Sequence, residues 1–175
     1  MQVLDWQLII KENGSAVWQT VYRLLGNNTD SADCFQDTFI SALEVAKRQR
    51  VRNITALLIH LATARAIDRL RQRNRQIYRR TDLDVLDAVP CSNSGPVQQT
   101  QTKELIVQLR NALAHLPPKE AKVFCLRYLS DMSYRQIAKE LCISTNAAGV
   151  LLHRAKAKLR EALAPQSIDN DRIIS

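Results

Sequence analysis

Apolar residues recur at helical spacing along most of the 175-residue chain, and the alternation typical of strands is rare. In the first half of the chain, this pattern predicts helices near residues 2–11, 15–25, 31–46 and 54–76. In the second half, it predicts helices near residues 103–115, 118–129, 133–141 and 145–163. Ala, Leu, Arg and Gln, which favour helix, are abundant. The sequence therefore predicts an all-α protein.

A polar segment with Pro90, Gly95 and Pro96 interrupts the helical pattern between the two halves. It predicts a linker that joins two small helical domains flexibly or semi-flexibly. The expected first domain, linker, second domain and tail are residues 1–80, 81–104, 105–163 and 164–175.

The helix predicted near residues 31–46 has a clear beginning and two different sides. Asp30 is its expected N-cap, because an aspartate side chain can accept hydrogen bonds from the free N–H groups of a first turn. The apolar side, expected to face the core, consists of Ala32, Phe35, Phe39, Ala42 and Ala46. The acidic residues lie away from this stripe, and they are Asp33, Asp37 and Glu44. They form either an ordinary solvated surface or a docking face for a protein partner.

Residues 134–159 predict two amphipathic helices around a short break at Cys142–Ser144. This spacing is typical of a helix-turn-helix, in which the second helix enters the major groove of DNA. Ser133 and Gln136 match a capping box at the start of the first helix, and Pro118 suits the first turn of the preceding one. The apolar positions are Ile137, Ala138, Leu141, Ala148, Leu151, Leu152, Ala155 and Leu159. An ordinary helical hairpin with the same spacing remains an alternative.

Charge is distributed unevenly along the chain. The formal net charge is +8, but residues 1–46 sum to −4, from 2 basic and 6 acidic residues. Residues 47–80 sum to +10, from 11 basic residues and 1 acidic residue. This segregation favours binding to an anionic partner by one part of the chain.

Arginines become frequent toward the end of the helix predicted at 54–76. Arg65, Arg69 and Arg73 recur at four-residue spacing, so they form one stripe along the helix. Because so many guanidinium groups occur with so few acids, phosphate binding is favoured over a merely solvated face. Asp68 is expected to form a structural ion pair with a neighbouring arginine rather than to act in catalysis.

No pattern in the sequence indicates catalysis or metal binding. The 4 cysteines lack CxxC spacing, the 3 histidines lack HxxxH spacing, and no Gly-rich phosphate loop occurs. We therefore expect a non-enzymatic protein without a cofactor, and keep a DNA-cutting or DNA-joining enzyme as a minor alternative. A cytoplasmic location is expected, because no apolar run approaches the length of a membrane helix and the N-terminus does not resemble a signal peptide.

Three segments resemble, in the same order, those of bacterial RNA polymerase sigma factors of the extracytoplasmic-function (ECF) type in the sigma-70 superfamily. DSADCFQDTFISAL (Asp30–Leu43) resembles their polymerase-docking helix, and LIHLATARAIDRLRQRNR (Leu58–Arg75) resembles the helix that follows. LPPKEAKVFCLRYLSDMSYRQIAKELCISTNAAGVLLHRAKAKLREAL (Leu116–Leu163) resembles their second domain. The resemblance implies a factor that binds core polymerase, directs it to promoters and helps to open the duplex at the minus-ten element.

The resemblance also implies which residues make the contacts. Polymerase binding is expected at Asp33, Gln36 and Asp37. Contacts on the minus-ten side of the promoter are expected from Arg50, Arg52, Asn53, Arg65, Arg69, Arg71, Arg73 and Arg75. Contacts of the helix-turn-helix to the minus-thirty-five element are expected from Arg135, Lys139, Ser144, Thr145, Asn146, His153, Arg154, Lys156 and Lys158. The implied partners are core RNA polymerase and promoter DNA, and an anti-sigma factor is a further candidate.

The chain departs from the family pattern in three places. The tryptophan, arginine and asparagine that relatives carry before the arginine-rich segment are absent from residues 57–64, and these are residues suited to base stacking and base contacts. Cys142 replaces the usual turn glycine, so the turn is expected not to need a strongly left-handed backbone. Gly149 and Leu151 stand where lysine and arginine are usual, and small Ala147, Ala148 and Gly149 are expected to allow close approach to thymine methyl groups.

Two other classes of protein fit the same residues. A stand-alone helix-turn-helix regulator would use the first half of the chain only to dimerise or to sense a signal. A helical adaptor would use the fold for protein contacts alone and would show no salt-dependent association with DNA. Charge reversal at Asp33, Gln36 and Asp37 separates the first from a sigma factor, because only a sigma factor would lose polymerase binding.

Overall fold

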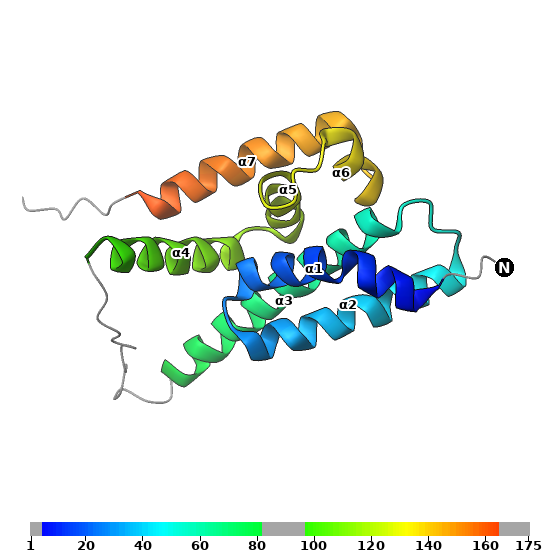
Figure 1. Ribbon diagram of the computed structural model, residues 1–175. Helices are drawn as coiled ribbons and strands as arrows, with labels where there is room; N and C mark the ends of the chain where they lie inside the picture. The colour runs from blue at the N-terminus through cyan, green and yellow to red at the C-terminus, as the bar shows by residue number, and fades with distance from the viewer. Residues whose placement is uncertain (1–4, 82–96, 165–175) are drawn as a thin grey trace, which may run out of the picture.

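Helices make up the regular structure of the described chain. The computed structural model describes residues 5–81 and 97–164, and all regular elements in these ranges are α-helices (Figure 1). They are α1 (Trp6–Leu25), α2 (Asn28–Arg48), α3 (Ile54–Thr81), α4 (Val97–His115), α5 (Pro118–Tyr128), α6 (Tyr134–Glu140) and α7 (Thr145–Leu163). The predicted all-α class is confirmed. None of the described helices is long and apolar enough to cross a membrane.

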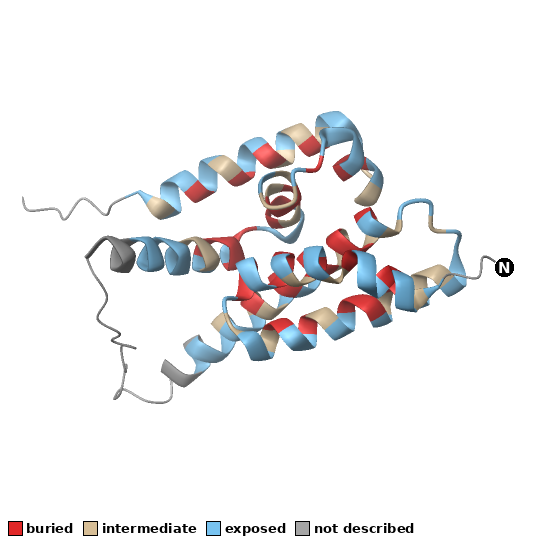
Figure 2. Ribbon diagram, viewed as in Figure 1, coloured by how far each residue is buried: buried red, intermediate tan, exposed pale blue. Residues whose placement is uncertain are grey.

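The first half of the chain forms a bundle of α1, α2 and α3, which contact one another pairwise. Their common core includes Val17, Leu24, Phe39 and Ile67. Among the described positions of α3, none beyond Leu70 is buried, so its arginine-rich end extends past the bundle core (Figure 2). The bundle therefore presents that end of α3 to solvent.

α1 runs without a break from Trp6 to Leu25, where the sequence predicted two helices. The amide of Asn13 donates to the carbonyl oxygen of Ile9 at 3.0 Å, within the core. A Cβ at position 14 would lie in ordinary van der Waals contact with the ring of Phe35, at 3.7 Å, so this ring of α2 packs over Gly14. Tertiary packing thus overrides the weak helix propensity of asparagine and glycine at this point.

α2 begins earlier than predicted, and its N-cap is Asn27 instead of Asp30. The side-chain oxygen of Asn27 accepts from the backbone N–H of Asp30 at 2.8 Å. The predicted core stripe is also partly wrong, because Ala32 is exposed while Ser31 and Thr38 are buried. α2 packs against both α1 and α3, and two neighbours bury a wider arc of the helix than a single stripe.

The second half of the chain contains α4 to α7, and α6 and α7 form the predicted helix-turn-helix. α4 begins at Val97, before the predicted start at residue 103. Pro118 occupies the first turn of α5 as predicted. Ser133 and Gln136 make the predicted capping box, with N···O distances of 2.8 and 3.3 Å. These signals were reliable because each suits a helix start, where backbone N–H groups lack partners.

The turn between α6 and α7 has a left-handed backbone at Cys142, with φ 52°. The N–H of Ile143 donates to the carbonyl of Ala138 at 2.9 Å, and the N–H of Cys142 donates to the carbonyl of Lys139 at 3.4 Å. This pair of bonds defines a Schellman motif. Its left-handed position is usually occupied by glycine, which has no Cβ to oppose that conformation. The expectation that this position avoids a left-handed backbone is therefore wrong.

The two halves of the molecule pack directly against each other. α3 contacts α4, α5 and α6 as well as its own bundle. Ile59, near the start of α3, belongs to one apolar cluster with Leu126 and Ile137 of the second half. Leu70 belongs to another cluster with Leu113 and other residues of α4. The predicted pair of helical domains, the second a helix-turn-helix, is confirmed, and the apolar cores of the two are joined through α3.

Candidate polymerase and nucleic-acid interfaces

The residues predicted to bind polymerase lie on the exposed side of α2. Asp33, Gln36 and Asp37 are all exposed. Asp33 accepts a hydrogen bond from Arg69, whereas Gln36 and Asp37 make no hydrogen bond or ion pair with other described residues. Two of the three side chains are therefore free to contact a partner without first breaking a bond.

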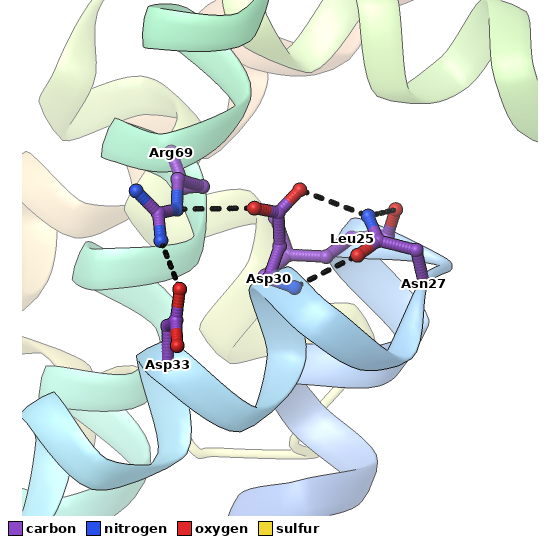
Figure 3. Close-up of polar contacts among 5 residues, drawn as sticks. All are labelled: Leu25, Asn27, Asp30, Asp33 and Arg69. Atoms are coloured by element: carbon purple, nitrogen blue, oxygen red, sulfur yellow. Dashed lines mark hydrogen bonds and ion pairs between the residues drawn. The ribbon is translucent and has the colours of Figure 1, made fainter.

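Arg69 joins α3 to the first turns of α2 (Figure 3). Its Nη2 donates to Oδ2 of Asp33 at 2.8 Å, and its Nε lies 3.4 Å from Oδ1 of Asp30. The same Asp30 carboxylate accepts from the amide of Asn27 at 2.9 Å, so the N-cap and the ion pairs form one network. This arrangement uses a predicted DNA-binding arginine to fix the packing of two helices.

Two further arginines of α3 also contact protein oxygens. Arg65 donates to the hydroxyl of Ser41 on α2 at 2.8 Å, although its side chain remains exposed. Arg71 is half-buried and donates to the backbone carbonyl of Leu116 at the end of α4. Arg73 and Arg75 are exposed and form no hydrogen bond or ion pair within the described part of the chain.

Asp68 does not form the ion pair predicted from its spacing. It is exposed on α3, and no basic side chain of the described residues lies within ion-pair distance of it. Arg65 and Arg71, the two arginines at helical spacing from Asp68, are directed to Ser41 and Leu116 instead. Contacts between helices thus outweigh the weak attraction between neighbours on one helix.

The loop between α2 and α3 presents predicted DNA-binding residues beside the helix-turn-helix. Arg50 and Arg52 are exposed, and the side chain of Asn53 accepts from the N–H of Ala56 at 3.0 Å at the start of α3. A hollow of about 200 Å³ is lined by Gln49, Arg50, Val51, Arg52, Asn53, Leu57, Lys139 and Glu140. Burial raises the pKa of Glu140, and the adjacent Lys139 opposes this rise. This loop therefore lies against the end of α6.

The outward side of the first half of α7 consists of two rows at four-residue spacing. The rows are Thr145, Gly149 and His153, and Asn146, Val150 and Arg154. Ser144 is the N-cap, and its hydroxyl accepts from the N–H of Ala147 at 3.0 Å. Of the three polar residues predicted to contact DNA at the helix entry, Ser144 is therefore engaged in a cap. The side chains of Thr145 and Asn146 make no hydrogen bond within the described chain.

At one of the two positions of α7 where the usual cation is absent, the fold gives a structural cause. Leu151, which stands in the place of a usual arginine, packs against the helix-turn-helix core. Ala148 is completely buried and is not available for the expected thymine contact, which is a correction to the sequence analysis. Val150 is 43% exposed and was missed, although its spacing from Asn146 and Arg154 indicates the same row. A Cβ at Gly149 would meet nothing within 4 Å, so this position is open.

The remaining predicted cations of the helix-turn-helix differ in setting. Arg135 and Lys139 are exposed on α6. The Nζ of Lys158 lies 2.9 and 3.1 Å from the two carboxylate oxygens of Glu120, a residue that is only 5% exposed. Lys156 lines a hollow of about 400 Å³ between α4, α5 and α7, with Leu109, Phe124, Tyr128, Leu159, Arg160, Leu163 and Ala164. Lys158 is therefore committed to a buried carboxylate of α5.

The two buried cysteines, Cys34 and Cys125, are not in a reactive setting. Burial raises the pKa of the Cys34 thiol to about 11 and that of the Cys125 thiol to about 12, so both are un-ionised and unreactive. Cys142 is exposed, and Cys91 lies outside the described residues. No group of three or more metal-ligating side chains occurs within residues 5–81 and 97–164.

The fold and these surfaces define a class of protein. An acidic helix and an arginine-rich helix share one bundle, and a helix-turn-helix domain packs beside them. Sequence models of known families match the two parts in this order, as sigma-70 region 2 over residues 9–76 and sigma-70 region 4 over residues 106–159. The chain belongs to the sigma-70 family.

Two bacterial relatives are similar over most of this chain. The ECF RNA polymerase sigma factor SigE of Mycolicibacterium smegmatis is 27% identical over 163 residues, which are 93% of this chain and 63% of the relative. The ECF RNA polymerase sigma factor SigW of Bacillus subtilis is 25% identical over 154 residues, or 84% of this chain and 82% of the relative. The chain thus spans less than two thirds of the length of the first relative.

Solved structures support the same fold. The sigma factor RpoE in complex with the anti-sigma factor NepR from Bartonella quintana is similar with a TM-score of 0.54 and 19% identity, over 91% of this chain and 96% of that one. CnrH in complex with the cytosolic domain of CnrY is similar with a TM-score of 0.57 and 21% identity, over 90% of this chain and 86% of that one. At these identities the likeness concerns the fold.

Proposed function

We propose that this chain is an ECF-type sigma factor, which binds core RNA polymerase and directs promoter-specific transcription initiation without being an enzyme. The observation that carries the proposal is the ordered match to sigma-70 regions 2 and 4 over the two helical domains. Both named relatives are ECF RNA polymerase sigma factors. A chain with this role works in the cytoplasm, where polymerase and promoter DNA are found.

The proposed division of labour follows the two halves of the chain. Residues 1–80 bind core polymerase and the minus-ten element, and residues 105–163 bind the minus-thirty-five element, with 81–104 as linker and 164–175 as tail. The exposed acidic side of α2 and the exposed arginines near its end support the first assignment. The outward row of Asn146, Val150 and Arg154 supports the second.

The decisive experiment adds the purified chain to purified core polymerase and a promoter library. A sigma factor co-purifies with core polymerase and yields transcripts from a defined subset of promoters, which sequencing identifies. Absence of both polymerase binding and initiation would contradict the proposal. Duplex binding without polymerase binding would instead favour a stand-alone helix-turn-helix regulator.

The docking face on α2 is tested by reversing charge where no internal contact is lost. Gln36→Lys and Asp37→Lys together are expected to weaken polymerase binding at least tenfold, because both side chains are exposed and unpaired in the described structure. Gln7→Lys and Glu12→Lys together, on the exposed side of α1, change the charge by the same amount and are expected to leave binding unaltered. Asp33 is left intact, because its change would also release Arg69.

The proposed DNA contacts fall into two groups. Cations that hold no hydrogen bond or ion pair in the described structure are the first candidates for phosphate contacts, and they are Arg50, Arg52, Arg73, Arg75, Arg135, Lys139, His153, Arg154 and Lys156. Asn53, Arg65, Arg69, Arg71, Ser144 and Lys158 remain proposed contacts that must first share or exchange a protein partner. Thr145 and Asn146 are proposed to contact base edges at the helix entry.

An anti-sigma factor is a further proposed partner. One solved structure of similar fold is a sigma factor bound to the anti-sigma factor NepR. A protein of this kind would compete with core polymerase for the chain, so its addition should lower the amount of chain recovered with polymerase. Candidates that bind the chain but leave polymerase recovery unchanged do not have this role.

A further inference from the structure

Val150 is an exposed apolar residue in the middle of the outward side of α7. It is 43% exposed, and the buried Ala148 and Leu152 lie two positions before and after it. Two positions along an α-helix are about 200° apart, so Val150 points almost directly away from the core of the helix-turn-helix. Asn146 and Arg154, one turn to either side, are exposed in the same row. Val150 is therefore the central side chain of this row.

The fold does not account for a valine at this position. Val150 belongs to neither apolar cluster of the described residues. Valine is also a weaker helix former than alanine, because its branched side chain loses rotamer freedom in a helix. Single exposed apolar residues are common on protein surfaces, so the exposure of Val150 alone indicates nothing. What distinguishes Val150 is its place at the centre of the side that faces DNA under the proposed function.

The neighbours of Val150 leave it room to approach a base pair. Ala147 and Gly149, on either side of it, are small, and a Cβ at Gly149 would meet nothing within 4 Å. Ala148, from which contact with a thymine methyl group was expected, is buried. Val150 is therefore the apolar group that α7 can bring to a base edge in place of Ala148.

The leading half of α7 offers no cation for base recognition. Residues 145–152 include no lysine, arginine or histidine, so the bidentate contact of arginine to guanine is not available from this part of the helix. Valine can neither donate nor accept a hydrogen bond. The apolar group that unmodified base pairs present in the major groove is the C5-methyl group of thymine. The side chain of Val150 thus suits an A·T base pair that is approached from the major groove.

We propose that Val150 is a specificity-determining residue, which contacts the C5-methyl group of one thymine in the minus-thirty-five element. The proposal rests on the proposed function, because it places α7 in the major groove of that element. The exposed Arg135 and Lys139 of α6, together with Arg154, contact backbone phosphates and so fix the position of α7 on the duplex. The chain recognises the methyl group itself at this base pair, and 5-methylcytosine carries a methyl group at the same ring position as thymine.

The test uses the full chain with core polymerase, on a promoter selected from a library with a randomised minus-thirty-five element. Each thymine of the selected element, on either strand, is replaced singly by uracil, which removes only the methyl group. At one position this replacement is expected to weaken binding about fourfold, the effect of one buried methyl group. At the same position, 5-methylcytosine is expected to bind about fourfold more tightly than cytosine. Equal affinity within either pair of bases, at every thymine of the element, overturns the proposal.

Val150→Ala identifies the side chain that contacts the methyl group. Alanine favours helix, so this substitution at an exposed position is expected to leave the chain folded. The variant is expected to bind the thymine and uracil promoters with nearly equal affinity. Val107→Ala, at a 53% exposed position of α4, is the matched control and is expected to keep the fourfold preference for thymine. A fourfold preference that survives in Val150→Ala overturns the proposal, because another group must then contact the methyl group.

Failure of this proposal differs from failure of the proposed function. Initiation from selected promoters without any sensitivity to uracil retains the sigma-factor role and rejects the contact of Val150. Absence of both polymerase binding and initiation rejects the proposed function. In that case, the same replacements are made in duplexes selected by the chain alone. Uracil sensitivity that Val150→Ala abolishes there retains the methyl contact in a stand-alone regulator, and its absence rejects the contact as well.

Discussion

The arginine-rich helix α3 and α7, the second helix of the helix-turn-helix, hold their basic side chains in different ways. On α3, the guanidinium groups of Arg65, Arg69 and Arg71 each contact a protein oxygen on another element. On α7, His153 and Arg154 are exposed and make no hydrogen bond or ion pair within the described chain. Under the proposed function, DNA would therefore compete with protein partners along much of α3, whereas Arg154 of α7 could contact a phosphate directly. A high density of cations does not by itself measure the surface available to DNA.

Lys158 differs from its neighbours on α7, because it is paired with a carboxylate of another helix. Its replacement is expected to have the largest effect on stability. Lys158→Met is expected to lower the free energy of unfolding by about 2 kcal/mol, because it leaves the buried carboxylate of Glu120 without its cation, although water reaches the half-exposed lysine. Arg154→Met is the control and is expected to change stability by less than about 0.5 kcal/mol. Urea unfolding measures both. Equal stability of the two variants would show that Lys158 is as free as Arg154.

Cys142→Gly tests how much stability is lost because a residue other than glycine has a left-handed backbone in the turn between α6 and α7. Glycine adopts a left-handed backbone without steric cost, so the variant is expected to raise the free energy of unfolding by about 1 kcal/mol. Cys142→Ala is the control, because it removes the thiol but keeps the Cβ, and it is expected to show little gain. If Cys142→Ala stabilises the chain as much as Cys142→Gly does, the gain comes from removal of the thiol and not from relief of the backbone. Thermal and urea unfolding both report this difference.

Gly149→Lys tests whether the open position on α7 can be converted to a phosphate contact. Replacement of a glycine inside a helix is expected to stabilise by about 0.5–1 kcal/mol, and lysine and alanine should gain similarly. Only lysine is expected to tighten duplex binding and to steepen its dependence on salt by about one unit of slope. Gly149→Ala is therefore the matched control for binding. Identical salt dependence for both variants would place Gly149 away from the DNA.

Local patterns in the sequence were sufficient where a feature depends on near neighbours. The capping box of Ser133 and Gln136 and the helix-turn-helix spacing were found because both are set by residues a few positions apart. The continuous α1 was not predicted, since Asn13, in the middle of α1, has a partner distant in sequence, the hydroxyl of Thr55 on α3 at 2.7 Å. The N-cap of α2, by contrast, is a local feature, because the side chain of Asn27 accepts from the N–H of Asp30 three residues on, although Asp30 itself was predicted as the cap.

The sequence allows candidate site residues to be named, but it does not show which of their side chains are left without a partner inside the protein. The sequence treats Lys158 and Arg154 alike, and only the fold brings Glu120 to one of them. The two-domain division was visible from Pro90 to Pro96, but nothing local indicates that Arg71 reaches the end of α4. Long-range partners decide which cations remain free, and such partners leave no periodic signal along the chain.

Arg69 and Arg73 provide a paired test on α3 itself. Arg69→Ala is expected to lower the free energy of unfolding by roughly 0.5 kcal/mol, because the ion pairs with Asp30 and Asp33 are partly exposed to water. Arg73→Ala is expected to leave stability unchanged and to lower DNA affinity more than Arg69→Ala does. The double variant Arg69→Ala/Asp33→Ala completes a mutant cycle that isolates the pair. Equal losses of DNA affinity at both positions would show that the ion pairs do not withhold Arg69 from DNA.

The smallest expected effect concerns pH at the contact between the two halves. Burial, and then Lys122 of α5, lowers the pKa of His60 on α3 below its ordinary value of 6.5. The folded chain therefore binds fewer protons than the unfolded chain, and the contribution of His60 is fully present above pH 6.5 and is lost as pH falls through the folded pKa. His60→Gln is expected to lose less stability than the wild type between pH 7.5 and 5.5, measured by urea unfolding. His153→Gln, on the exposed side of α7, is the control and should follow the wild type. A wild-type pH dependence retained in His60→Gln would mean that α3 and α5 do not hold this histidine neutral.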